Sequence, residues 1–98
     1  MLIRIVRMTF KPEEVGAFLE LFDHSKEQIR NFPGCRHLTL MKDYHEDNIF
    51  STYSIWDDDE ALNNYRHSAL FENVWMATKR KFSAKPIAFS NLEYIKVE

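Results

Sequence analysis

The sequence is poor in the residues that build tight turns and covalent bridges. Only two glycines, Gly16 and Gly34, occur among its 98 residues. No GxGxxG, P-loop or HExxH motif is present, so nothing in the sequence supports a nucleotide-binding loop or a zinc peptidase. Cys35 is the only cysteine, which excludes an intramolecular disulfide and any zinc site built on cysteine pairs.

The sequence also lacks an excess of one charge and a long apolar run. Its 13 Lys and Arg against 15 Asp and Glu give a net charge of −2, without the concentrated basic face that nucleic acid or an anionic membrane attracts. No segment reaches the length that spans a bilayer, and residues 1–10 lack the continuous apolar core of a signal peptide. We therefore expect a soluble, cytoplasmic protein that binds neither nucleic acid nor membrane.

Apolar and aromatic residues, in contrast, are plentiful. Hydrophobic residues make up 45% of the chain and aromatic residues 14%, which is enough for residues 1–98 to form one domain with a modest core. Segments rich in β-branched and apolar residues predict strands over residues 2–10, 35–42, 49–56 and 87–97.

The segment between the first two predicted strands has the pattern of an amphipathic helix. Pro12 suits its first turn, and apolar side chains follow at spacings of three, four and seven residues. Pro33 and Gly34 should stop it.

A second helical region is predicted after the third strand. Asp57 and Glu60 resemble a capping box, so this region should begin near Asp58. The RHS step at residues 66–68 is expected to bend or restart it, and Pro86 ends it. The resulting β-α-β-β-α-β order predicts an α+β fold of the ferredoxin-like type, with a four-stranded antiparallel sheet and helices on one face.

Both faces of the predicted sheet are apolar. In the first strand Val6 and Met8 alternate with Ile3 and Ile5, and the third and last strands show the same mixture. A sheet that faced water on one side would be apolar on one parity only. Because the helices can cover one face only, we expect a second copy of the chain to cover the other, in a homodimer.

Two sequence motifs and the element order together resemble a known family. The motifs are NFPGC at residues 31–35 and YSIWDDDEALNNYRHSALF at residues 53–71. With the β-α-β-β-α-β order they resemble the antibiotic biosynthesis monooxygenase domain family, the dimeric α+β barrels, over nearly the whole chain. The resemblance bears on the fold more than on the function, because this fold serves several chemistries.

One branch of that family oxidises phenolic polyketides or quinols with O₂ and without a cofactor, and the resemblance implies this activity here. Trp56 matches the tryptophan that closes the third strand in those enzymes, and its indole N–H can donate to a substrate oxygen. Thr52 stands where they carry an asparagine, and a hydroxyl has less donor capacity than an amide. A dry aromatic pocket with a few polar donors suits this chemistry, because the substrate itself supplies the electron.

The resemblance and the aromatic strand-to-helix junction together select the candidate residues. In the predicted site Trp56 is the polar anchor, Thr52 and Tyr65 are auxiliary hydrogen-bonding groups, and a histidine is the base. The predicted catalytic residues are Trp56, Thr52, His67, Tyr65 and His37. The predicted apolar walls for a small aromatic substrate are Phe22, Phe50, Phe71 and Trp75.

Each candidate also has a simpler interpretation. Trp56 can pack the end of a strand, and Tyr65, Phe71 and Trp75 are spaced like a helical core stripe. His67 can be an exposed residue at a helix end, and His37 a buried neutral histidine. The alternative function is therefore a non-catalytic dimeric module that binds a small apolar metabolite, or a structural dimer without a ligand.

The sequence does not favour a cofactor or a metal. In the haem-degrading branch of the family an asparagine, a tryptophan and a histidine ligand fall at Val6, Tyr65 and Trp75 by the same register, and none matches, so haem has no axial ligand unless His67 substitutes. No pattern diagnostic of a third branch, of isomerases and decarboxylases, is found. No HxH or HxxxH pair occurs, and the DDDE run at residues 57–60 has the character of a helix cap.

Overall fold

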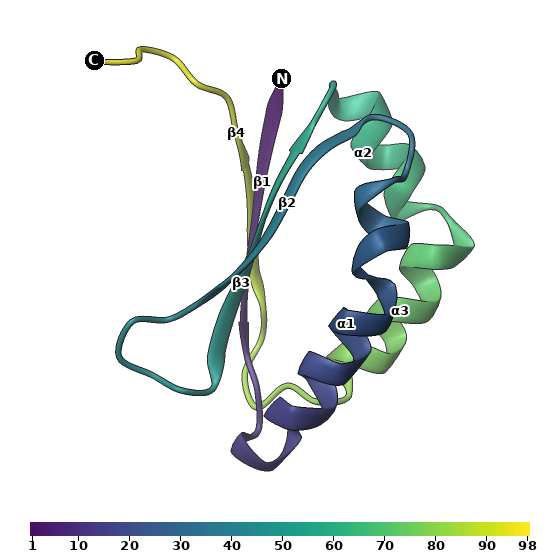
Figure 1. Cartoon of the computed structure of the whole chain (residues 1–98), viewed down its shortest axis with the longest axis vertical. Coiled ribbons are helices and arrows are strands. Elements are labelled where there is room, and N and C mark those ends of the chain that lie inside the picture. The colour runs from purple at the N-terminus through teal and green to yellow at the C-terminus, as the bar shows by residue number, and fades with distance from the viewer.

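The computed structural model describes residues 1–98 and contains one four-stranded antiparallel sheet in the order β2-β3-β1-β4. This is the ferredoxin-like arrangement that the element order predicts. All helices lie on one side of the sheet, and the other side is open (Figure 1). The strands are β1 (Leu2–Thr9), β2 (Cys35–Lys42), β3 (Ile49–Trp56) and β4 (Ile87–Asn91).

Four helical segments cover the sheet. They are the 3₁₀ turn η1 (Pro12–Glu14), α1 (Val15–Arg30), α2 (Asp59–Arg66) and α3 (Ala69–Lys79). The predicted break in the second helical region is a complete interruption, because His67 ends α2 and Ser68 starts α3. The Ser68 hydroxyl oxygen accepts a hydrogen bond from the Phe71 backbone N–H at 3.1 Å, which satisfies one of the free donors at the start of α3.

The predicted cap of α2 was placed one residue early. Asp58, in extended conformation, is the N-cap, and its carboxylate accepts from the Ala61 backbone N–H at 2.8 Å. Asp57 is unavailable as a cap because its two carboxylate oxygens accept from Arg36 at 2.6 and 3.0 Å. Its backbone N–H donates to the Gly34 carbonyl, so Asp57 still belongs to the end of the β2-β3 pair.

The last strand is shorter than predicted. It ends at Asn91, and residues 92–98 form no regular secondary structure, although the expected strand continued to residue 97. The physical reason is the register with β1, in which Asn91 pairs with Ile3, so the partner strand is nearly exhausted. Residues 92–98 therefore have no neighbour in this chain to accept their backbone hydrogen bonds.

Side chains on the helix-facing side of the strands form two separate core clusters. The first contains Met8, Phe10, Phe18 and Phe50, and the second contains Cys35, Trp56 and Leu62. Phe10 and Trp56 are the most completely buried large side chains, at 0% and 1% exposure. The space between the two clusters is not filled, and it becomes the cavity described below.

Gly34 lets the turn before β2 approach α2 closely. Its φ of +88° lies in the left-handed region, which side chains with a Cβ adopt at a cost. A Cβ at this position would lie 2.5 Å from the Cβ of Ala61. The glycine of the NFPGC motif therefore seats the start of α2, which in turn places Leu62 and Tyr65 over Trp56.

The open face of the sheet is apolar and exposed. Ile87, Phe89 and Met41 are 58%, 46% and 39% exposed, and cross-strand pairing places Ile5 and Tyr53 in the same row as Phe89. The prediction that the helices cover only one of two apolar faces is confirmed.

Candidate functional site

A cavity of about 360 Å³ lies between the helices and the sheet. Nineteen residues line it, thirteen of them hydrophobic, and it extends from Met8 and Phe18 at one core cluster to Trp56 and Leu62 at the other. Its volume falls within the range of about 300–1,000 Å³ that is typical of small-molecule sites.

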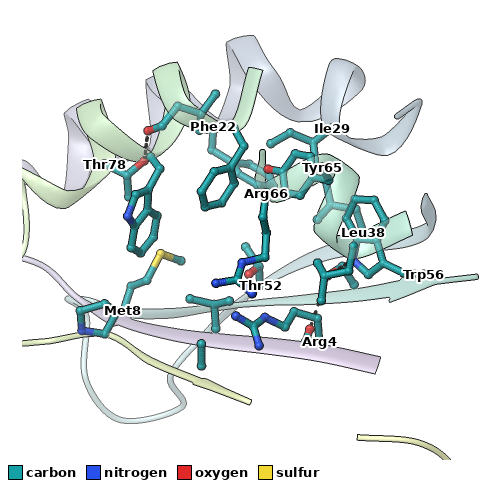
Figure 2. Close-up of a pocket in the computed structure, with 18 of the residues that line it drawn as sticks. Arg4, Met8, Phe22, Ile29, Leu38, Thr52, Trp56, Tyr65, Arg66 and Thr78 are labelled. Atoms are coloured by element: carbon teal, nitrogen blue, oxygen red, sulfur yellow. Dashed lines mark hydrogen bonds between the residues drawn. The ribbon is translucent and has the colours of Figure 1, made fainter. Parts of the chain in front are cut away.

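Aromatic side chains form one continuous wall of this cavity. The Trp56 and Tyr65 rings are stacked, with centroids 4.9 Å apart. The Tyr65 and Phe71 centroids are 5.2 Å apart, and the Phe71 and Trp75 rings stack again at 5.8 Å. Phe22 extends from α1 into the same cavity (Figure 2). The predicted residues Trp56, Tyr65, Phe22, Phe71 and Trp75 are thus brought to one cavity.

The Trp56 indole N–H already has a partner inside the protein. It donates to the Ser54 hydroxyl at 3.0 Å, two residues earlier on the same strand. The Ser54 hydroxyl itself points toward the Arg4 backbone carbonyl, 3.5 Å away. A ligand oxygen that accepted from the Trp56 N–H would have to displace the Ser54 hydroxyl. Ser54 is therefore part of the polar lining of the cavity, and sequence reasoning did not select it.

Tyr65 and Thr52 are the two predicted hydroxyl-bearing residues that line the cavity, beside Ser54 and Thr78. Thr52 projects from β3 into the cavity, and Tyr65 projects from α2 above it (Figure 2). Burial raises the pKa of the Tyr65 phenol well above its ordinary value of 10. The phenol is therefore protonated at neutral pH and can donate a hydrogen bond to a ligand oxygen.

Two arginines, Arg4 and Arg66, also line the cavity, and sequence reasoning did not select them. Arg4 comes from β1 and Arg66 from α2, and no lining residue is an aspartate or glutamate. Burial, and then the positive charge of Arg66, lower the pKa of Arg4. The signal was present in the sequence, because Arg4 has the same strand parity as the core-facing residues Val6 and Met8.

Three of the predicted site residues lie outside the cavity. His37 lies on the open face of the sheet, where its Nε2 is 2.6 Å from the Thr39 hydroxyl oxygen. His67 is exposed at the end of α2, with its Nδ1 2.7 Å from the Asn63 carbonyl oxygen. Phe50 is buried in the core cluster around Phe10. No histidine lines the cavity.

No three side chains among His, Cys, Asp and Glu lie close enough together to hold a metal ion. None of the helices combines the length and the hydropathy that crossing a bilayer requires.

Solved structures share this fold over the full chain. A protein described as an antibiotic biosynthesis monooxygenase superposes with a TM-score of 0.89 at 21% identity, covering 98% of this chain and 100% of that one. A conserved protein from Methanosarcina mazei Go1 gives 0.89 at 19% identity, with 96% and 94% covered. Rv0793 from Mycobacterium tuberculosis gives 0.88 at 16% identity, with 99% and 98% covered. At such identities the likeness establishes the fold and not the activity.

No match is found among curated proteins. The family model for antibiotic biosynthesis monooxygenase matches residues 1–74, which hold the first three strands, η1, α1, α2 and about half of α3. The chain therefore belongs to the antibiotic biosynthesis monooxygenase family.

Proposed function

We propose that this protein oxidises a small phenolic or quinol-type aromatic with O₂ and without a cofactor, inside the cavity between the helices and the sheet. The observation that carries the proposal is the 360 Å³ cavity itself, with its stacked wall from Trp56 to Trp75. A cavity of this size holds one small ring system and surrounds much of it with apolar side chains. The family to which the chain belongs is monooxygenase-like or small-molecule-binding in general.

The chemistry requires an electron-rich ring and suitable hydrogen-bond donors. A hydroquinone that reacts with one O₂ yields one hydroxyquinone and one water, so the substrate supplies all the electrons and one oxygen atom enters the product. The reaction starts more easily when the substrate is stabilised as its anion. In the proposal Tyr65 and Thr52 donate to the ring oxygens, Trp56 anchors the ring, and Phe22, Phe71 and Trp75 hold its faces.

The proposal includes a homodimer formed through the open face of the sheet. Proteins of this family are commonly dimeric. The exposed apolar row around Phe89 and the unpaired residues 92–98 are two features that a second copy would cover. The tail carries apolar side chains that are mostly exposed in this chain, at Leu92, Tyr94, Ile95 and Val97.

Oxygen uptake tests the activity. Metal-free protein is mixed with hydroquinones and anthrones in the presence of a chelator, and wild type is compared with Tyr65→Phe and Trp56→Phe. We expect uptake that survives the chelator and falls about tenfold or more in each variant, the equivalent of about 1.4 kcal/mol of transition-state stabilisation. Tyr44→Phe, whose ring is 91% exposed in the β2-β3 hairpin, is the control and should retain wild-type uptake.

The second candidate function is a module that binds a small aromatic without reacting. Two observations favour this module. The Trp56 N–H is already hydrogen-bonded to Ser54, and no histidine lines the cavity to act as a base. Calorimetric titration with the same aromatics separates the two functions. Binding that Trp56→Phe and Tyr65→Phe weaken, with no uptake above the spontaneous rate, supports the module and contradicts the oxygenase.

A further inference from the structure

Arg4 and Arg66 place two positive charges at a cavity whose other lining residues are neutral and mostly apolar or aromatic. We propose that the ligand of this cavity is an aromatic carboxylate, whose ring packs against the aromatic wall and whose carboxylate is bound by both arginines. The inference rests on the proposed function in one respect only, that the cavity holds a small aromatic.

The two arginines converge from different layers of the fold. Arg66 descends from α2 toward the sheet beside Thr52, and Arg4 extends from β1 into the same part of the cavity (Figure 2). Their charges are close enough for Arg66 to shift the ionisation of Arg4. Two like charges held together repel each other, so this placement costs free energy unless an anion joins them.

Neither arginine is neutralised by a carboxylate of the protein. Arg4 donates only to the Ser90 hydroxyl, at 3.1 Å, and neither residue is in any of the six ion pairs of the chain. Two other arginines do have carboxylate partners, because Arg7 pairs with Asp43 and Arg36 forms a bidentate pair with Asp57. Arg30 and Arg80 also lack a carboxylate partner, but neither lines the cavity. Arg4 and Arg66 are thus the two arginines that bring an unneutralised charge to it.

The surroundings restrict the anion to one that carries an apolar ring. Arg4 is half-buried and Arg66 is exposed, so the charge is at the solvent-facing part of the cavity while Trp56, Tyr65 and Phe71 line the interior. A guanidinium matches the two oxygens of a carboxylate in geometry, and such charged hydrogen bonds are the strong ones. A free inorganic anion would leave the aromatic wall unused.

Calorimetric titration of a matched pair of ligands tests the inference. The pair is a dihydroxybenzoate and the dihydroxybenzamide with the same ring substitution, which differ in charge but hardly in size. We expect wild type to bind the carboxylate about tenfold or more tightly than the amide, since hydrogen bonds between two charged groups are stronger than those from a guanidinium to a neutral amide. Arg4→Gln and Arg66→Gln should each remove most of this preference and leave the affinity for the amide within about twofold.

Two control variants separate charge recognition from folding and from net charge. Arg66→Lys keeps the charge without the forked geometry and should restore part of the preference. Arg80→Gln changes the net charge equally at the end of α3, outside the cavity lining, and should bind both ligands as wild type does. Circular dichroism melts of all variants check that they fold.

The outcomes distinguish this inference from the proposed function. Equal binding of carboxylate and amide, unchanged in the arginine variants, would overturn the inference while the cavity still binds aromatics. An equal loss of preference in Arg80→Gln would overturn it as well, because the preference would then reflect net charge only. Absence of binding by either ligand would overturn both the inference and the proposed function.

Discussion

The helix-covered face of the sheet and its open face are built from the same four strands but differ in what lies over them. On the covered face, Phe10 and Trp56 are almost completely buried and a cavity separates two packed clusters. On the open face, Ile87 and Phe89 remain about half exposed with no element above them. The comparison shows that an apolar strand pattern does not say what lies over it. Helices of the same chain cover one apolar face, and no element of this chain covers the other.

The largest expected effect is on the covered face. Phe10→Ala should lower the free energy of unfolding by about 3–5 kcal/mol, because Phe10 is fully buried and packs against Phe18 with ring centroids 4.2 Å apart. Tyr44→Ala, at a ring that is 91% exposed, should change it by less than about 0.5 kcal/mol. Urea unfolding curves measure both, and a small loss for Phe10→Ala would contradict the assigned core.

The next effect concerns the turn that seats α2 on the covered face. Gly34→Ala should cost about 2–3 kcal/mol, because alanine is strained at a φ of +88° and its Cβ would collide with Ala61. Gly16→Ala is the matched control. A Cβ there meets nothing within 4 Å, and alanine in a helix should stabilise by about 0.5–1 kcal/mol. The two glycine variants should thus shift the melting temperature in opposite directions.

A charge on the open face tests what covers it. Phe89→Asp should weaken self-association about tenfold or more, because the carboxylate would be buried without a partner in the proposed dimer. Met76→Asp serves as a control, since Met76 on α3 is 42% exposed, close to the 46% of Phe89, but lies on a helix. Light scattering across a dilution series measures the association. A wild type that is monomeric at micromolar concentration would rule out the dimer.

The smallest expected effect is confined to high pH. The pKa of Tyr65 is raised in the folded state, so its stabilising contribution is complete below the ordinary value of 10 and is lost as the pH rises beyond it. Wild type should lose about 1 kcal/mol more stability than Tyr65→Phe one pH unit above that value. Tyr94→Phe, at a ring 89% exposed, should keep the wild-type slope. Denaturant unfolding at a series of alkaline pH values provides the comparison.

Local patterns were sufficient to predict most of the fold. Strand parity separated Val6 and Met8 from Ile3 and Ile5 onto two apolar faces, and the RHS step marked the interruption between α2 and α3. The two errors concern the cap of α2, which was misplaced by one residue, and the end of β4, which is set by pairing with β1. Asp57 and Asp58 are both acceptable caps by sequence, and contact with Arg36 decided between them. The end of β4 depends on where its partner β1 begins, and the sequence of the last strand alone does not contain that information.

The candidate site was predicted less completely than the fold. Trp56, Thr52 and Tyr65 were selected by the family resemblance and do line the cavity, whereas His37 and His67 lie outside it. Strand parity decides the position of His37, because its neighbour Leu38 is the one that faces the cavity. Whether the selected residues act on a substrate remains a prediction for the experiments above.

The sequence by itself determined the order of the elements, their faces and the need to cover both sides of the sheet, because hydrophobic periodicity and capping are local properties of the chain. Only the tertiary structure decided that two core clusters leave a cavity between them. It also decided that the Trp56 N–H is bonded to Ser54 and that Arg4 and Arg66 meet without a carboxylate. These features depend on side chains from elements far apart in sequence, whose volumes and charges meet only when the layers pack.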